Sequence, residues 1–259
     1  MKLPIFQVDA FTSQLFSGNP AAICPLDDWL EDAVMQNIAV ENNLSETAFF
    51  TGQNDVFEIR WFTPATEVDL CGHATLATGH VLFNHLNYDK RIVHFESKSG
   101  PLTVRKDNEF VTLNFPSTRL DISEASPVLI EALGVNPVAV YDSDDLFVLL
   151  SSEEEVSRVE PDFNLLSKLP SRGIIVTAPG EDCDFVSRFF APAVGINEDP
   201  VTGSAHTKLI PFWAEELDKE TMTARQLSQR GGELFCTYLG ERVEISGKAV
   251  TYMIGEIFI

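Results

Sequence analysis

The sequence predicts an α+β protein built from two similar lobes. Its 259 residues exceed the common size of one domain, yet they suffice for two domains that each bury a core. The second half repeats motifs of the first at a spacing of about 130 residues, which indicates an internal duplication. Short runs that alternate apolar with polar residues predict strands, and helical patterns are interspersed among them.

The repeat is visible in two blocks of sequence. Residues 60–65 (RWFTPA) recur as residues 188–193 (RFFAPA), and residues 71–74 (CGHA) correspond to residues 202–205 (TGSA) after a three-residue insertion. Farther along, matched residues follow at one constant offset without a gap. The matches are Gly100, Leu102, Val104, Glu109, Val111 and Leu113 with Gly232, Leu234, Cys236, Glu241, Val243 and Ile245.

Strands are predicted over residues 5–11, 57–63, 91–96 and 109–115, which are short and rich in β-branched or aromatic residues. Helices are predicted after a cap at Asp27 and from Ser126 to Gly134, where apolar residues recur at a spacing of three to four.

One helix of each lobe is expected to be central. Residues 73–86 place small and apolar side chains on all sides, as in a helix that a curved sheet surrounds. Its partner in the second half begins at Ser204, and Pro211 is expected to kink or restart that helix because proline lacks an N–H.

The boundary between the lobes is placed in the polar segment 116–126, which carries Pro, Ser, Thr and Asp without periodicity. We therefore expect an N-terminal lobe over residues 1–118 and a C-terminal lobe over residues 119–259. The last run, residues 249–259, reads as a strand that can pair with either lobe.

Composition excludes several classes of function. The net charge of −21 disfavours nucleic acid and anionic membrane surfaces, since both are bound by clustered Lys and Arg. No apolar run reaches the ~18 residues that a membrane span needs. The N-terminal residues do not resemble an export signal, so a cytoplasmic protein is expected. The four scattered cysteines are expected to be free thiols.

Two glycine turns suggest a binding site for an anion. In each half a helix begins directly after a glycine, at Gly72-His73 and at Gly203-Ser204. N–H groups at such helix starts attract a carboxylate or a developing oxyanion, although a glycine can equally serve only the turn.

Three titratable residues are candidates for proton transfer. Glu46 precedes an apolar strand, where partial burial raises a carboxyl pKa, although a solvated strand-edge carboxylate fits as well. His73 begins a helix, whose field is expected to disfavour the cationic imidazole; a satisfied core histidine is the alternative. Asp199 lies in a turn-like cluster before Gly203, where capping is its ordinary role.

Four segments in order resemble the PhzF-like isomerase family of phenazine biosynthesis. The resemblance runs from Val8 to at least Gly232, and its segments are residues 16–22 (FSGNPAA), 43–47 (NLSET), 71–75 (CGHAT) and 198–206 (EDPVTGSAH). It implies the fold of diaminopimelate epimerase, with two pseudo-symmetric lobes, each a curved, mostly antiparallel sheet wrapped around a central helix.

The resemblance also implies a function. Glu46 would be the base and acid that moves a proton between two carbons, assisted by His73 and Asp199, while Asn19, Gly72, Gly203 and Ser204 would bind substrate. In the phenazine enzyme the substrate is a dihydro-hydroxyanthranilate, and no cofactor is used. A homodimer is implied as well. We expect a small carboxylate-bearing substrate that contacts both helix starts between the lobes.

Two other functions stay open. Racemases and epimerases of this fold that use two thiols need a Cys before the glycine in each lobe; Cys71 meets this requirement, but Thr202 occupies the second position. A non-catalytic ligand-binding protein of the same fold is the other alternative.

No metal is expected, because Cys71, His73 and His206 do not show zinc-ligand spacing. Thr207 and Lys208 depart from the small or apolar residues usual in the family.

Overall fold

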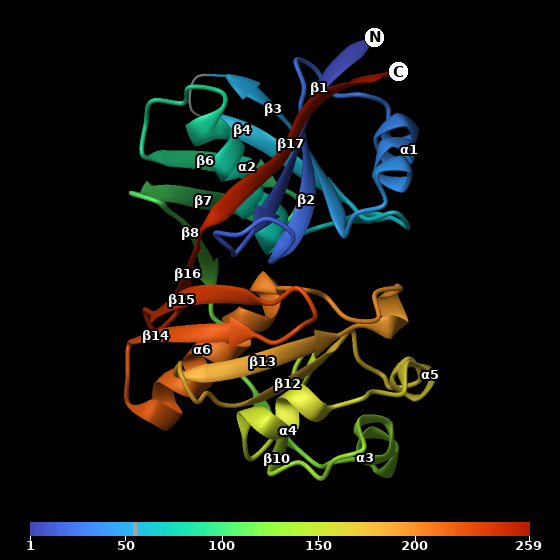
Figure 1. The fold of residues 1–259 in the computed structure, drawn as a ribbon, viewed down its shortest axis with the longest axis vertical. Coiled ribbons are helices and arrows are strands. Elements are labelled where there is room, and N and C mark those ends of the chain that lie inside the picture. The colour runs from blue at the N-terminus through green and yellow to red at the C-terminus, as the bar shows by residue number, and fades with distance from the viewer. Residues whose placement is uncertain (54–55) are drawn as a thin grey trace. The chain divides into compact units, whose positions relative to one another are not determined.

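The computed structural model describes residues 1–53 and 56–259 and divides the chain into two compact units. Unit 1 comprises residues 1–115 and 244–259, and unit 2 comprises residues 116–243. The strand β16 (Arg242–Gly247) contains the point at which the chain returns from unit 2 to unit 1. Figure 1 shows the elements of each unit.

The described residues of unit 1 form two helices and a curved, mixed sheet. Its elements are β1 (Lys2–Ala10), β2 (Asn19–Pro25), α1 (Asp32–Asn42), β3 (Glu46–Gln53), β4 (Val56–Phe62), β5 (Glu67–Val68), α2 (Gly72–Asn84), β6 (Ile92–Ser97), β7 (Gly100–Asp107), β8 (Phe110–Pro116) and β17 (Ala249–Phe258). The last strand, β17, pairs antiparallel with β1 along its whole length.

Unit 2 has a related set of elements. They are β9 (Asp121–Ser123), α3 (Pro127–Leu133), β10 (Ala139–Asp142), β11 (Leu146–Leu149), α4 (Glu153–Arg158), α5 (Phe163–Leu166), β12 (Ile174–Pro179), β13 (Phe185–Phe190), a 3-10 turn (Pro192–Val194), α6 (Gly203–Leu217), β14 (Thr221–Gln226) and β15 (Gly232–Tyr238).

The strand pairings repeat in the same order in both units. In unit 1, β1–β2 is antiparallel, β2–β3 parallel, β3–β4 antiparallel, β4–β6 parallel and β6–β7 antiparallel. In unit 2, the same alternation runs through β10–β11, β11–β12, β12–β13, β13–β14 and β14–β15. The predicted α+β class and its two pseudo-symmetric sheets are confirmed.

Each unit wraps its sheet around one long helix, as expected. The helix α2 is buried along nearly its whole length and contacts β1, β2, β3, β7 and β17 (Figure 1). Close packing against β7 requires Gly79, because a Cβ there would lie 2.6 Å from Cγ1 of Val104. In unit 2, α6 contacts β14 and β15.

Of the two outcomes expected at Pro211, a kink or a restart, the restart does not occur, because α6 passes through Pro211 as one unbroken helix. Proline at this position cannot donate to the carbonyl of Thr207. The backbone N–H of Thr118 donates to that oxygen instead, at 2.9 Å. The lost helical hydrogen bond is therefore replaced from outside the helix.

One predicted helix start is also wrong. The first helix begins at Asp32 rather than after a cap at Asp27. The side chain of Trp29 donates from Nε1 to Glu58 and lies under the guanidinium of Arg60. These two contacts hold the segment before Asp32 in a non-helical path. By contrast, Ser126 caps α3 and Gly134 ends it, as predicted.

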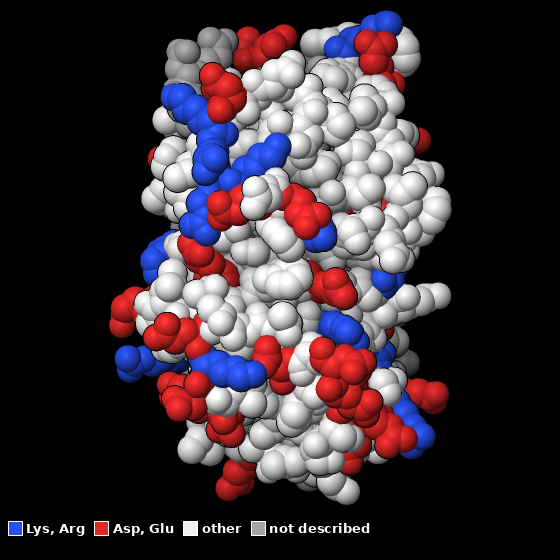
Figure 2. All heavy atoms as spheres, turned by 60° about the vertical axis from the view of Figure 1, so that its left-hand side comes forward, with Lys and Arg blue, Asp and Glu red and all other residues white. Residues whose placement is uncertain are grey.

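The state of the cysteines and the charge of the surface follow the expectations from the sequence. In the part of the chain that the structure describes, Cys24, Cys71, Cys183 and Cys236 are free thiols. No described helix combines the length and the apolar character needed to cross a bilayer. Figure 2 shows acidic side chains spread over the visible face among fewer basic ones, in keeping with 39 acidic against 18 basic residues.

Candidate active site

The first cluster of site residues forms where β2, β3 and α2 begin in unit 1. Parallel pairing of β2 with β3 brings their first residues, Asn19 and Glu46, to the same edge of the sheet. The start of α2 packs against both strands and places His73 between these two side chains. Asn19 and His73 are 0% and 3% exposed, and Glu46 is 9% exposed.

The His73 ring uses both nitrogens. Its Nε2 lies 3.1 Å from Oε2 of Glu46. Its Nδ1 lies 3.0 Å from Nδ2 of Asn19 and 3.5 Å from Sγ of Cys71. The amide of Asn19 can present its N–H to a neutral ring or, turned over, its oxygen to a protonated ring, so this contact suits both protonation states.

The contact between Glu46 and His73 is close but not aligned as a hydrogen bond. Oε2 of Glu46 and Nε2 of His73 are buried, and neither has an aligned hydrogen-bond partner among the described residues. Buried polar atoms normally have an aligned partner, whereas these two have only the ion-pair contact with each other. Two such atoms 3.1 Å apart are therefore available to exchange a proton with each other or with a ligand.

In this cluster the pKa of His73 differs from the expectation that was based on the sequence. Burial disfavours the cationic ring, but the charge of the Glu46 carboxylate and the contacts of the ring with Glu46 and Cys71 raise the pKa of His73 well above its usual value. The expectation that the helix field keeps His73 neutral is therefore wrong, since it omitted the carboxylate beside the ring. Burial raises the pKa of the Cys71 thiol to about 11, so Cys71 is a neutral thiol.

The second cluster lies at the start of α6 in unit 2. The hydroxyl of Thr202 donates to Oδ2 of Asp199 at 2.5 Å. The amide of Gln226 accepts from the backbone N–H of Thr202 at 2.8 Å and donates to the carbonyl of Asp199 at 2.8 Å. Gln226 is 1% exposed and thus fixes both residues from the end of β14.

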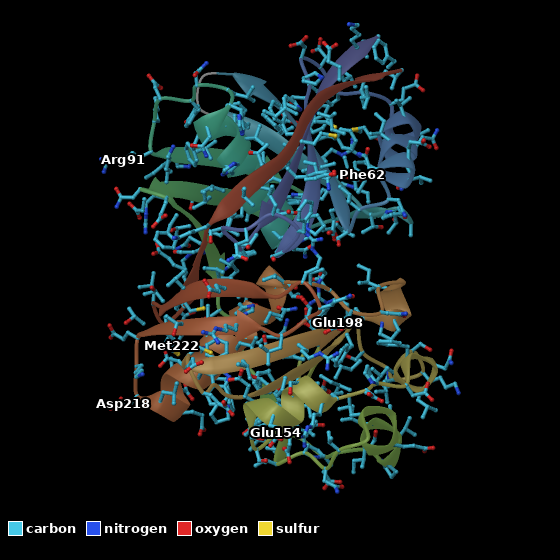
Figure 3. All side chains as sticks on the ribbon, viewed as in Figure 1. Phe62, Arg91, Glu154, Glu198, Asp218 and Met222 are labelled. Atoms are coloured by element: carbon cyan, nitrogen blue, oxygen red, sulfur yellow. The ribbon has the colours of Figure 1, made fainter. Side chains whose placement is uncertain are left out.

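The loop that carries Asp199 is held by a fork of two hydrogen bonds. Arg188 donates from Nε and Nη2 to the carboxylate of Glu198, at 2.7 and 3.1 Å; Glu198 is labelled in Figure 3. In unit 1, Arg60 forms the same fork with Glu67, at 2.7 and 2.9 Å. Both units therefore keep an arginine–glutamate pair, and this pair orders the segment before each central helix.

The predicted substrate-binding residues lie at different depths. Gly72 and Gly203 are buried first residues of α2 and α6. Ser204 is half-buried, and its hydroxyl accepts from Nη2 of Arg172 at 3.1 Å. Asn19 is fully buried against His73.

Sequence reasoning missed Cys71 as a neighbour of His73, and it missed Gln226 and Arg172. The last two lie 24 and 32 residues from their partners, so only the duplicated strand order could have indicated them.

The structure also brings together a possible set of metal ligands. One ligand atom each of Glu46, Cys71 and His73 lies within 4.8 Å of the others, a grouping that sequence spacing did not reveal. However, His73 directs opposite ring nitrogens to Glu46 and to Cys71, so one ion cannot replace both contacts in this arrangement. The arrangement fits proton exchange better, and the absence of a metal stays a prediction.

Comparisons with known proteins agree with the fold. A family model described as phenazine biosynthesis-like protein (PhzC-PhzF) matches residues 8–255. An uncharacterized isomerase of Pseudomonas aeruginosa is 50% identical over 259 residues, which is the whole of both chains.

Two solved structures share the fold of this chain. A PhzF-family protein of Enterococcus faecalis is 48% identical and superposes with a TM-score of 0.98 over all of both chains. A hydroxyproline epimerase of Agrobacterium vitis shares the fold, with a TM-score of 0.66 at 9% identity over 99% of this chain and 92% of that one.

Proposed function

The chain belongs to the phenazine biosynthesis-like (PhzC-PhzF) family, and from this premise we propose that it is a cofactor-independent isomerase that moves a proton between two carbons of a small carboxylate-bearing substrate. Close relatives are named isomerases, which makes the general class isomerase or epimerase. The observation that carries the proposal is the buried contact of Glu46 with His73, in which both facing atoms lack an aligned hydrogen bond.

The proposed mechanism is general acid–base catalysis. The carboxylate of Glu46 takes a proton from one carbon, the double bond shifts, and the same proton or one exchanged with it returns to another carbon. Atoms balance without a co-reactant, because only a hydrogen and a double bond change position. His73, 3.1 Å away, stabilises the carboxylate or relays its proton, and Asn19 orients the ring in either protonation state.

The residues of unit 2 have proposed roles in binding and assistance. The first N–H groups of α6, at Gly203 and Ser204, are suited to a carboxylate, since a helix N-terminus carries partial positive charge. Asp199 assists the proton transfer, and its carboxylate is fixed by the hydroxyl of Thr202. In unit 1, Gly72 opens α2 in the corresponding way.

A two-thiol racemase is disfavoured by two observations. The position that would hold the second thiol is Thr202, whose hydroxyl already donates to Asp199. The thiol at Cys71 has a pKa of about 11, so it is not a thiolate at neutral pH. We therefore place the base at Glu46.

The proposal includes a cytoplasmic homodimer. Two-fold assemblies are the commonest form of soluble oligomer. Light scattering at working concentration is expected to give twice the chain mass of 28.7 kDa, and a monomer would refute the assembly but not the chemistry.

The test is a screen for turnover in heavy water. Pools of small carboxylic acids are incubated with the protein in D₂O containing a strong chelator, and NMR follows loss of each compound. We expect one compound to be converted to an isomer, which carries deuterium at the new carbon where the transferred proton exchanges with the solvent, with heat-denatured protein as the control. Conversion that needs an added metal ion would contradict cofactor independence, and binding without conversion would favour the ligand-binding alternative.

A further inference from the structure

The duplication places a second pair of side chains close to the positions that Glu46 and His73 occupy in unit 1. The parallel pair β11–β12 of unit 2 corresponds to β2–β3 of unit 1, and α6 corresponds to α2. In unit 1 the start of β3 supplies Glu46, which faces His73 at the helix start. In unit 2 the segment before β12 supplies Arg172, which donates from Nη2 to Ser204 at the helix start. An acid–base pair in one unit is thus matched by a cation–hydroxyl pair in the other.

Arg172 is fixed by an unusually buried neighbour. Its Nε donates to Oδ1 of Asp145 at 2.9 Å and its Nη2 donates to Oδ2 at 2.5 Å. The Asp145 side chain is 0% exposed. Two donors on one carboxylate hold the guanidinium in a single plane, and the ring of Phe189 lies 5.7 Å from its carbon.

Asp145 is itself held by Lys208 of α6. Nζ of Lys208 lies 2.8 Å from Oδ2 of Asp145 and 2.8 Å from Oδ1 of Asp144, and the Lys208 side chain is 2% exposed. Burying a lysine is costly unless it is paired. The pairing with Asp144 and Asp145 offsets that cost, and it fixes the carboxylate that holds Arg172.

The result is a set of hydrogen-bond donors without acceptors at the start of α6. Because the Ser204 oxygen accepts from Arg172, its hydroxyl hydrogen is directed to another acceptor. Nη1 of Arg172 has no hydrogen-bond partner among the described residues, and the Arg172 side chain is 41% exposed. The first turn of α6 has no side-chain cap.

We propose that Arg172 is a specificity-determining residue, which selects a planar carboxylate on the substrate by donating to it from Nη1 beside the Ser204 hydroxyl. This inference rests on the proposed function and deepens it. The charges of Arg172 and Lys208 are balanced by those of Asp144 and Asp145. Selection therefore depends on directed N–H donors rather than on net positive charge, and a lysine cannot replace the guanidinium fork.

The experiment compares two probes that differ only in the group to be recognised: 2-aminobenzoate and its neutral analogue 2-aminobenzamide. Calorimetry measures both affinities for the wild-type protein, R172M, R172Q and R172K, after melting curves have shown each variant to be folded. The control is R158M, which removes an arginine of the same unit whose side chain is 76% exposed.

We expect each Arg172 variant to lose about tenfold to a hundredfold in affinity for the carboxylate, with little change for the amide. R172K, which keeps the charge, is expected to lose as much as R172Q, and R158M is expected to bind like the wild type. Equal losses on both probes, unchanged binding in the folded variants, or full rescue by R172K would overturn the role of Arg172. If the wild-type protein binds neither probe, the proposed substrate class fails, and the inference fails with it.

Discussion

At the scale of single residues, the site depends on buried polar atoms that lack the partners such atoms normally have. Oε2 of Glu46 and Nε2 of His73 face each other without an aligned hydrogen bond. A purely structural ion pair would be expected to align that bond, because charge-assisted hydrogen bonds are strongest when they are aligned. The misaligned contact is consistent with a site that leaves both atoms available to a substrate.

The sequence was sufficient to predict some of the site residues but not the contacts between them. Glu46, His73 and Asp199 could be selected because they lie in short motifs with a family resemblance. The contact between Asn19 and His73 could not be predicted, since it depends on how two strands and a helix converge. The protonation of His73 was predicted wrongly, because the helix field is local in sequence whereas the Glu46 carboxylate is not.

His206 gives a prediction at this scale. Burial lowers the pKa of His206 from 6.5 to about 4, against a hydrogen bond to the carbonyl of Thr202. Between these pH values the unfolded chain binds a proton that the folded chain does not, so stability falls as the pH falls from 6.5 to 4. The loss is about 3 kcal/mol.

The measurement is the free energy of unfolding of the wild type and H206N in urea at several pH values. H206N is expected to show a shallower loss between pH 6.5 and 4, whatever its stability at pH 7. Some loss remains, because burial lowers the pKa of His80 to about 4 as well. Parallel pH profiles for the two proteins would contradict the assignment.

At the scale of secondary-structure elements, the central helices show which local rules hold. The all-round apolar pattern of residues 73–86 correctly predicted a buried helix, because burial on every side leaves no polar face. The rule that proline interrupts a helix failed at Pro211, because Thr118 supplies the missing donor. A donor 89 residues away in sequence lies outside any local pattern.

Gly79 gives a prediction at this scale. Replacing a helical glycine with alanine ordinarily stabilises a helix by about 1 kcal/mol. In G79A the new methyl group would meet Cγ1 of Val104, which is fully buried on β7. We expect a net loss of about 1–3 kcal/mol in the free energy of unfolding, since overpacking a filled core is destabilising.

The control for this variant is G255A on β17, where the added methyl group would lie 3.8 Å from Cγ2 of Ile5, an ordinary contact. Urea titrations measure the midpoint of unfolding of both variants. G255A is expected to unfold near the wild-type midpoint and G79A at a much lower urea concentration. A stabilised G79A would show that α2 and β7 are not packed as described.

At the scale of the whole molecule, the duplication is the feature that sequence predicted best. The matched blocks at residues 60–65 and 188–193 fall at the ends of β4 and β13, and the ungapped series from Gly100 and Gly232 opens β7 and β15. The pairing of β17 with β1 could not be predicted, because it joins residues at opposite ends of the chain, such as Lys2 and Phe258. Residues that lie so far apart in the sequence form no local pattern that would indicate their pairing.

The duplication also explains how one fold can serve two chemical roles. Equivalent helix starts carry His73 beside a glutamate and Ser204 beside an arginine. The first pair suits proton transfer, and the second suits recognition of an anion. The strongly negative net charge does not oppose a small anionic substrate, because directed N–H groups act over a few ångströms, where the distant charges are screened.

The central claim, that Glu46 carries the proton, is tested most directly by comparing E46Q with the wild type on the substrate that the screen identifies. The amide keeps the shape of the side chain but cannot accept the proton. We expect the rate of isomer formation to fall by roughly 10²- to 10⁴-fold, with melting temperature and substrate affinity close to those of the wild type. The control, E96Q, alters an exposed glutamate of β6 and is expected to keep full activity. A folded E46Q protein that forms the isomer at a near-normal rate would contradict the account.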